Sequence, residues 1–194
     1  MRLPTQLTVL RIVLAAVFFV LFALMEPPQT LWASIVFVVA AVTDWWDGHL
    51  ARIMKATTPL GAFLDPLADK LLTGAALVAF AWQGLIPMWM VIIVLARDAY
   101  LTVLRTVADS MRVPVATSYI AKVKTFIQMT FIVVVLAAML FVKSVVTPSI
   151  LIWPMMAIAL LTVASGLHYT YQNWPLIRSL IYRYFLRKPG QETI

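Results

Sequence analysis

Long hydrophobic runs recur along the chain, and they constrain its fold more than any other feature. Each run is roughly twenty residues long, the length that an α-helix needs to cross the hydrocarbon core of a bilayer. Hydrophobic residues make up 63% of the 194 residues and charged residues 12%, far from the composition of a soluble domain. The runs continue into the C-terminal part, so one removable N-terminal leader does not explain them. The sequence therefore predicts an all-α integral membrane protein.

Six such runs are present, separated by short polar or proline-containing turns. We expect transmembrane helices at about residues 7–25, 31–53, 62–82, 86–109, 119–142 and 150–169. Residues 174–194 are rich in arginine and aromatic side chains, which predicts a basic tail lying at the membrane interface. No repeat or linker divides the chain, so we expect residues 1–194 to form a single membrane domain.

Positive charge is unevenly distributed between the two ends of the predicted helices. The chain has 15 Lys and Arg against 8 Asp and Glu, a formal net charge of +7. Nearly all of these cations fall at one set of helix ends, whereas Lys143 falls in the opposite loops. Because cytoplasmic loops carry the excess of Lys and Arg, that side is predicted to be cytoplasmic and to hold both termini. The sequence thus indicates a multi-pass protein of the cytoplasmic (inner) membrane, with anionic membrane lipids rather than nucleic acid beside its basic surface.

Four aspartates stand in the window TDWWDGHLARIMKATTPLGAFLDPLADK, residues 43–70. Asp44 and Asp47 are three residues apart near the end of the second predicted helix. Asp65 and Asp69 are four residues apart at the start of the third. Residues at these spacings share a helix face. Because the connection between the two helices is short, we expect antiparallel neighbours whose aspartate pairs converge at one depth.

The ordinary interpretation is that each aspartate lies in headgroup water beside a cation such as Arg52 or Lys70. Four converging carboxylates argue against it, because each costs roughly 2.5–3.5 kcal/mol toward the bilayer centre and the pairs repel each other. Bound divalent cations remove both penalties. The sequence has no cysteine, and all-oxygen ligands favour Mg²⁺, Mn²⁺ or Ca²⁺ over zinc. Four carboxylates suit two cations about 4 Å apart, an arrangement that serves phosphoryl transfer.

The same window resembles the signature of the CDP-alcohol phosphatidyltransferase family. Every fixed position of that signature is matched by Asp44-x-x-Asp47-Gly48-x-x-Ala51-Arg52 and, after eight residues, Gly61-x-x-x-Asp65-x-x-x-Asp69. The resemblance implies a six-helix membrane enzyme, usually a homodimer. Such an enzyme transfers a phosphatidyl-type group from a CDP-linked lipid to an alcohol and releases CMP.

The resemblance also assigns roles by position. Asp44, Asp47 and Asp65 would hold two Mg²⁺ or Mn²⁺ ions, and Asp69 would assist with the second ion and act as general base toward the acceptor hydroxyl. The site of the CDP-lipid would be lined by Gly48, Ala51, Arg52 and Gly61. The active site would then lie at the cytoplasmic side of the second and third helices.

Other segments resemble the bacterial phosphatidylglycerophosphate synthases within that family. LPTQLTVLR (3–11) is similar to their I-P-N-x-L-T-x-x-R, LARDAYLTVLR (95–105) to their A-R-E followed by L-R, and AKVKT (121–125) to their G-K-x-K-T. The departures are Thr5 for Asn, Asp98 for Glu and Ala121 for Gly, and Thr5 is the candidate nucleotide contact among them. The acceptor implied is glycerol-3-phosphate. It would attack CDP-diacylglycerol in line, giving phosphatidylglycerophosphate and CMP.

A second anion site is predicted in the same half of the chain. Arg97 falls near the middle of a predicted helix, where a cation is costly unless it faces a polar cavity. With Arg105, Lys122 and Lys124 it forms a candidate pocket for the acceptor's phosphate. The alternative for the two lysines is that they merely flank a membrane helix on the positive side. Asp98 is interpreted as a partner of Arg97 or Arg105.

Three alternatives stay open at this point. Two of them lie within the family, where the acceptor could instead be phosphatidylglycerol, giving cardiolipin, or an inositol phosphate. In a different class, a cation transporter would use the aspartates as a transit site. Transport needs polar residues along the whole path, whereas these aspartates lie at one membrane face. The sequence favours the transferase.

Overall fold

Helices make up nearly all of the computed structural model, which describes residues 3–25, 29–54, 59–110 and 119–181. Within these ranges, side chains are not described at residues 3–8, 44–54, 59–69, 109–110, 119–120, 143, 176 and 179–181. The elements are α1 (Leu3–Phe19), the π-helix η1 (Val20–Leu24), α2 (Thr30–Met54), α3 (Pro59–Trp82), α4 (Met88–Ser110), α5 (Tyr119–Phe141), the 3-10 turn η2 (Lys143–Val145), α6 (Pro148–Gln172) and α7 (Trp174–Ile181).

Each of the six expected segments is helical, and the differences lie at the ends. α3 and α6 begin earlier than expected, at Pro59 and Pro148, because proline fits the first turn of a helix. α4 begins later, at Met88, since Pro87 disfavours helical backbone at the residue before it. Part of the expected interfacial tail forms a separate helix, α7, which the sequence analysis did not resolve.

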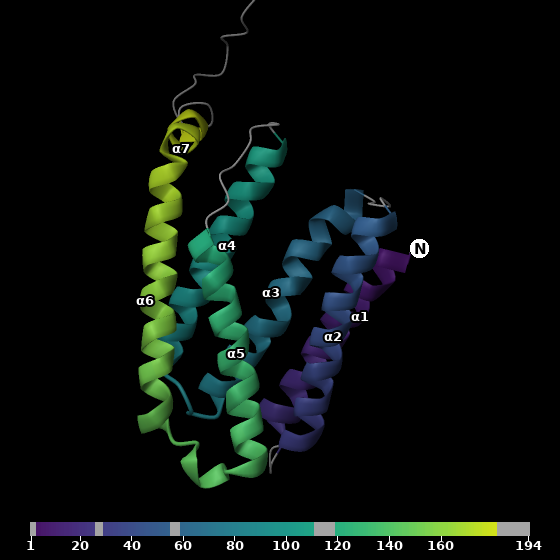
Figure 1. Cartoon of the computed structure of the whole chain (residues 1–194), viewed down its shortest axis with the longest axis vertical. Coiled ribbons are helices and arrows are strands. Elements are labelled where there is room, and N and C mark those ends of the chain that lie inside the picture. Colours follow the sequence, from purple (N-terminus) through teal and green to yellow (C-terminus); the bar gives the residue numbers. More distant parts are fainter. Residues whose placement is uncertain (1–2, 26–28, 55–58, 111–118, 182–194) are drawn as a thin grey trace, which may run out of the picture.

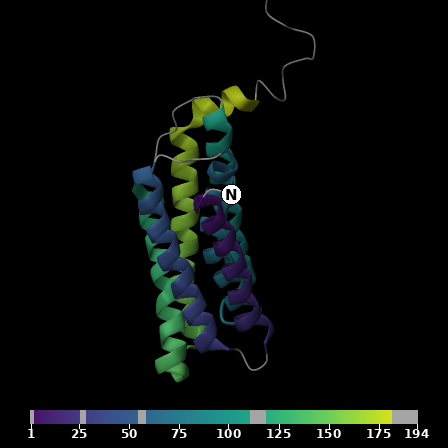
Figure 2. The same ribbon diagram turned by 90° about the vertical axis from the view of Figure 1, so that its right-hand side faces the viewer.

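The helices run up and down along the long axis of the molecule (Figures 1 and 2). α3 is central, packing against α1, α2, α4 and α5, while α6 packs against α4 and α5. The start of α1, the end of α2 and the start of α3 lie toward the upper end in Figure 1, as do the ends of α4 and α6. α7 packs on α6 and turns across that upper end (Figure 2). The chain segments that carry the aspartate signature therefore lie at the same end as α7.

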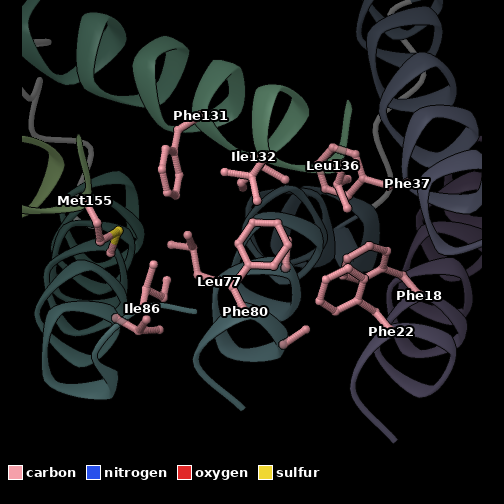
Figure 3. Packing of buried hydrophobic residues seen from close by; sticks show 14 of the residues in the cluster. Phe18, Phe22, Phe37, Leu77, Phe80, Ile86, Phe131, Ile132, Leu136 and Met155 are labelled. Atoms are coloured by element: carbon pink, nitrogen blue, oxygen red, sulfur yellow. The ribbon is translucent and has the colours of Figure 1, made fainter. Parts of the chain in front are cut away.

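An apolar core fills the lower half of the bundle, where all six long helices contribute buried side chains, some of which Figure 3 shows. The ring of Phe18 is stacked on that of Phe22, with 5.7 Å between the centroids, and Phe80 meets Phe22 edge-on at 5.3 Å. Phe37 of α2 tilts against Phe18 at 5.6 Å. All four rings are 0% exposed. This packing ties α1, α2 and α3 into one unit at the end away from the aspartates.

The lower end of α1 departs from α-helical geometry, and a side chain from another connection compensates. Residues Val20–Leu24 form a π-helix, in which the regular pattern of backbone hydrogen bonds changes. Gln83, directly after α3, donates from Nε2 to the carbonyl oxygens of Phe22 (3.1 Å) and Ala23 (3.3 Å). Gly84 follows with φ of 70°, a backbone conformation that favours glycine. The hydrogen bonds from Gln83 thereby hold the turn after α3 against η1.

Two segments among the described residues are long and apolar enough to cross a membrane by length and composition, Ala121–Phe141 and Pro148–Gln172. Shorter apolar helical segments are Val9–Leu24, Thr30–Thr43 and Lys70–Trp82. Many large hydrophobic side chains also stand exposed on the outside of the helices, where lipid rather than water would contact them. These features indicate a helical membrane protein.

Candidate active site

The four aspartates lie on two helices that contact each other and run antiparallel (Figure 1). Asp44 and Asp47 belong to the second half of α2, and Asp65 and Asp69 to the first half of α3. The expected antiparallel pairing of these helices is confirmed. The side chains of all four aspartates lie outside the described residues, as do those of the predicted CDP-lipid contacts Thr5, Gly48, Ala51, Arg52 and Gly61. Their ligand roles therefore stay predictions.

A buried ion pair joins α4 and α5 further inside the bundle. Lys124 donates from Nζ to both carboxylate oxygens of Asp98, at 2.9 and 2.7 Å. Lys124 is 1% exposed and Asp98 is buried as well. Arg97 adds a second cation, donating from Nη1 to Asp98 Oδ1 at 3.0 Å. The interpretation of Asp98 as a partner of Arg97 is confirmed. One carboxylate thus holds two cations, so these three side chains carry a net charge of +1 inside the protein.

Lys70 brings α3 to the same place. Its Nζ donates to the backbone carbonyl oxygen of Asp98 at 2.9 Å and to the hydroxyl of Thr102. We call Lys70, Arg97 and Lys124 the cation cluster. Because Lys70 follows Asp69 directly along α3, this cluster lies beside the predicted position of the general base. The aspartate signature and the candidate acceptor site, far apart in the sequence, are neighbours in the fold.

The Arg97 guanidinium also reaches α6. Its Nη2 donates to Ser165 Oγ at 2.8 Å. Gly166 leaves room for the side chain, since a Cβ atom added there would lie 3.3 Å from Arg97 Cγ. Among the residues that the structure describes, the Nε of Arg97 is buried and has no hydrogen-bond partner. The side chain is therefore held by α4 and α6, while its Nε donor stays unused.

The other two candidates for the acceptor phosphate lie further out. Arg105, on α4, is exposed, and its guanidinium carbon lies 5.7 Å from the ring centroid of Tyr169 on α6, a cation–π contact. Lys122 is exposed on α5, whereas Lys124 two residues later is buried. Residues two apart on a helix point to different sides. The structure thus brings Arg97 and Lys124 together and leaves Arg105 and Lys122 near the surface.

The sequence analysis missed three participants of this cluster. Lys70 had a usable signal, because a lysine stands there at the edge of an apolar helix and must find a polar environment. Ser165 and Gly166 gave no signal of their own, since small residues in apolar helices usually serve helix packing. Only the fold shows that they face Arg97.

The chain is similar to a known enzyme family and to several named relatives. Residues 1–167 match the family model described as CDP-alcohol phosphatidyltransferase. This match contains both the aspartate window and the cation cluster.

The relatives are bacterial proteins named CDP-diacylglycerol–glycerol-3-phosphate 3-phosphatidyltransferase. That of Bacillus subtilis is 34% identical over 192 residues, covering 92% of this chain and 98% of the relative. That of Pseudomonas fluorescens is 34% identical over 195 residues, covering 92% and 93%. That of Sodalis glossinidius is 41% identical over 143 residues, covering 70% and 77%.

Proposed function

Because the chain belongs to the CDP-alcohol phosphatidyltransferase family, we propose that it transfers the phosphatidyl group of CDP-diacylglycerol to glycerol-3-phosphate, giving phosphatidylglycerophosphate and CMP. The observation that carries this proposal is the similarity to the Bacillus subtilis relative along nearly the whole of both chains. The reaction belongs to phospholipid biosynthesis, and its lipid substrate and product suit a helical membrane protein.

Two divalent cations, Mg²⁺ or Mn²⁺, are the cofactors of the proposal. Asp44, Asp47, Asp65 and Asp69 would hold them, since carboxylates are the oxygen ligands that these ions prefer. The bound ions would neutralise the charge that develops on the diphosphate during transfer. The spacing of the aspartates on two antiparallel, contacting helices supports this assignment.

The residues of the chain then have distinct tasks. The acceptor's hydroxyl oxygen attacks the phosphorus that bears the diacylglycerol, the bond from that phosphorus to the CMP oxygen breaks, and Asp69 takes the hydroxyl proton. Arg52 would grip the diphosphate with its planar fork of donors, as arginine does with phosphates. Thr5, Gly48, Ala51 and Gly61 would line the nucleotide site, where small side chains let the ligand approach the helix backbone. Positioning of the two substrates supplies much of the rate.

The acceptor's phosphate would bind at the cation cluster. Lys124 is buried and Arg97 is partly buried beside Asp98, with an excess of positive charge, and an anion relieves the cost of burying it. Arg105 and Lys122, being exposed, would attract the acceptor toward the site. The position of Lys70, one residue beyond Asp69, supports a short distance between the bound phosphate and the reacting hydroxyl.

The proposed topology has six membrane crossings, both termini on the cytoplasmic side, and the active site at that face of the cytoplasmic membrane. The start of α1 and the end of α6 lie at one end of the molecule, which supports termini on one side (Figure 1). Exposed indole rings near the lower end support a membrane interface there, namely Trp32, Trp82, Trp89 and Trp153. Residues 174–194 would lie on the cytoplasmic interface, and a homodimer is the proposed assembly.

One assay tests the proposed function against its alternatives. Purified protein in detergent with Mg²⁺ is given CDP-diacylglycerol and, in separate reactions, glycerol-3-phosphate, phosphatidylglycerol or inositol phosphate, and CMP release is followed. Release with glycerol-3-phosphate and not with the other two is the expected result. Release with another acceptor alone would move the chain to a different branch of the family. No release with any acceptor, together with ion flux in proteoliposomes, would favour the transporter.

A further inference from the structure

The orientation of the Arg97 side chain is fixed at several points. Nη1 donates to Asp98 Oδ1 on the same helix, and Nη2 donates to Ser165 Oγ on α6. The stem packs along Gly166. Arginine loses rotamer entropy when it is held in one orientation, and a contact from a second helix carries part of that cost before any ligand arrives.

Ser165 is suited to receive the guanidinium. The residue is 0% exposed, and its hydroxyl donates its one proton to the carbonyl oxygen of Thr162 at 3.0 Å. With the proton used there, the oxygen is left to accept from Arg97. The hydroxyl therefore has a defined direction, and it holds Nη2 without competing for a bound anion.

Gly166 determines how close Arg97 can lie to α6. A Cβ atom at this position would come within 3.3 Å of Arg97 Cγ, tighter than ordinary van der Waals contact. Any larger residue at position 166 would push the stem of the arginine away from α6. The guanidinium would move with it, and so would the buried Nε, which has no partner among the described residues.

We propose that Ser165 and Gly166 of α6 are positioning residues that orient the Arg97 guanidinium toward the phosphate of the acceptor. This inference rests on the proposed function. Asp98 and Ser165 each occupy one terminal nitrogen, and the unpartnered Nε together with the remaining Nη protons is left for the phosphate oxygens. The α6 helix would thus select acceptors that carry a phosphate, although it bears none of the residues of the aspartate signature.

Two substitutions test the inference. Ser165→Ala removes the acceptor for Nη2, and Gly166→Ala adds the Cβ atom that displaces the stem. Each should raise the Michaelis constant for glycerol-3-phosphate about tenfold, the effect of losing one hydrogen bond to a charged group. The Michaelis constant for CDP-diacylglycerol should stay within about twofold, because the nucleotide site is elsewhere. A general loss of structure would not raise the Michaelis constant for glycerol-3-phosphate while sparing that for CDP-diacylglycerol.

Thr162→Val is the matched control. It removes a buried hydroxyl from the same face of α6, one turn earlier. Within the described part of the chain, that hydroxyl donates to the carbonyl oxygen of Ile158 on its own helix and makes no hydrogen bond to Arg97. The two Michaelis constants should be unchanged in this variant. Thermal unfolding in detergent shows whether each variant folds. If either Ser165→Ala or Gly166→Ala does not fold, the other variant alone tests the inference.

Unchanged constants for glycerol-3-phosphate in the folded Ser165→Ala and Gly166→Ala proteins would overturn the inference. A parallel rise for both substrates would overturn it as well. Failure of the proposed function has a different signature, because the unmodified protein would then release no CMP with glycerol-3-phosphate. Calorimetric binding of glycerol-3-phosphate in the presence of Mg²⁺ gives a readout without turnover, and it should weaken in both variants but not in the control.

Discussion

The Nζ of Lys124 lies 2.9 and 2.7 Å from the two carboxylate oxygens of Asp98, and this contact joins α5 to α4 inside the bundle. Lys124 is 1% exposed, so water does not solvate its charge. Burying an ammonium group is costly, and the adjacent carboxylate offsets part of that cost. The ion pair therefore stabilises the fold in addition to any role in ligand binding. The effect of a substitution at either residue on stability must be measured before its effect on activity is interpreted.

We expect that Asp98→Asn destabilises the protein more than Asp98→Asn combined with Lys124→Met. The single change leaves a buried cation without its counter-charge, which costs about 3–5 kcal/mol, whereas the double change removes both charges. Unfolding in mixed micelles of mild detergent and SDS gives the free energies. Lys122→Met is the control, since an exposed lysine on the same helix should change stability by about 0.5 kcal/mol or less. A double variant no more stable than the single one would contradict the prediction.

We expect that Gln83→Leu destabilises the lower end of the bundle by about 1–3 kcal/mol. The change leaves two carbonyl oxygens of η1, those of Phe22 and Ala23, without the amide that now donates to them. Hydrogen exchange of the amides in residues 20–25 should rise, while exchange in α6 should not. Gln172→Leu, at the exposed end of α6, is the matched control. Equal effects of the two substitutions would show that Gln83 does not act through η1.

Much of the fold was predictable, because membrane helices are specified by length and hydropathy. The six long helices follow from runs of about twenty apolar residues, a signal that needs no tertiary information. The π-helix at Val20–Leu24 was not predictable, because hydropathy does not distinguish it from an α-helix and the Gln83 side chain that donates to it comes from a distant turn. α7 was anticipated as an interfacial segment but not as a helix, because eight residues carry too little periodic signal.

The candidate site likewise has one part that the sequence predicts and one part that only the fold reveals. The aspartate signature is local in sequence, so its eight positions could be recognised without a fold. The candidate acceptor site depends on contacts between α3, α4, α5 and α6, which the spacing of residues does not reveal. Lys122 and Lys124 were grouped by their common motif, although helical geometry turns them apart and the structure finds one exposed and one buried.

Activity should depend entirely on Mg²⁺ or Mn²⁺. The four carboxylates of the signature are expected to converge, and a divalent ion would supply the balancing charge that the diphosphate also needs. Excess EDTA should abolish CMP release, and added Mg²⁺ should restore it. Asp44→Asn should weaken the metal dependence and the rate together, because it removes one ligand charge. Full turnover in excess EDTA would sink the two-metal assignment.

Arg52→Ala should weaken use of the CDP-lipid and leave the acceptor side nearly intact. Its guanidinium is the proposed grip on the diphosphate, and losing a bidentate phosphate contact costs roughly tenfold or more in affinity. The measurement is the Michaelis constant for CDP-diacylglycerol at saturating glycerol-3-phosphate. Arg178→Ala, on exposed α7, is the control for removing an arginine from the same end of the protein. An effect confined to the acceptor would reverse the assignment of the two anion sites.

The role of Asp69 gives the most discriminating prediction. We expect Asp69→Asn to abolish transfer while binding of CDP-diacylglycerol stays measurable, because Asn keeps the shape of the side chain and loses its basicity. Removing an acid–base group costs about 10²–10⁴-fold in rate, whereas three remaining aspartates would still hold at least one ion for the diphosphate. The experiment pairs CMP release with equilibrium binding, both in detergent at saturating Mg²⁺. Retention of more than about a tenth of the rate would exclude Asp69 as the base. Parallel loss of binding and rate would make Asp69 chiefly a metal ligand. Lys70→Met is the control, because it removes the adjoining contact between α3 and α4, from Lys70 to the carbonyl oxygen of Asp98, and leaves Asp69 in place.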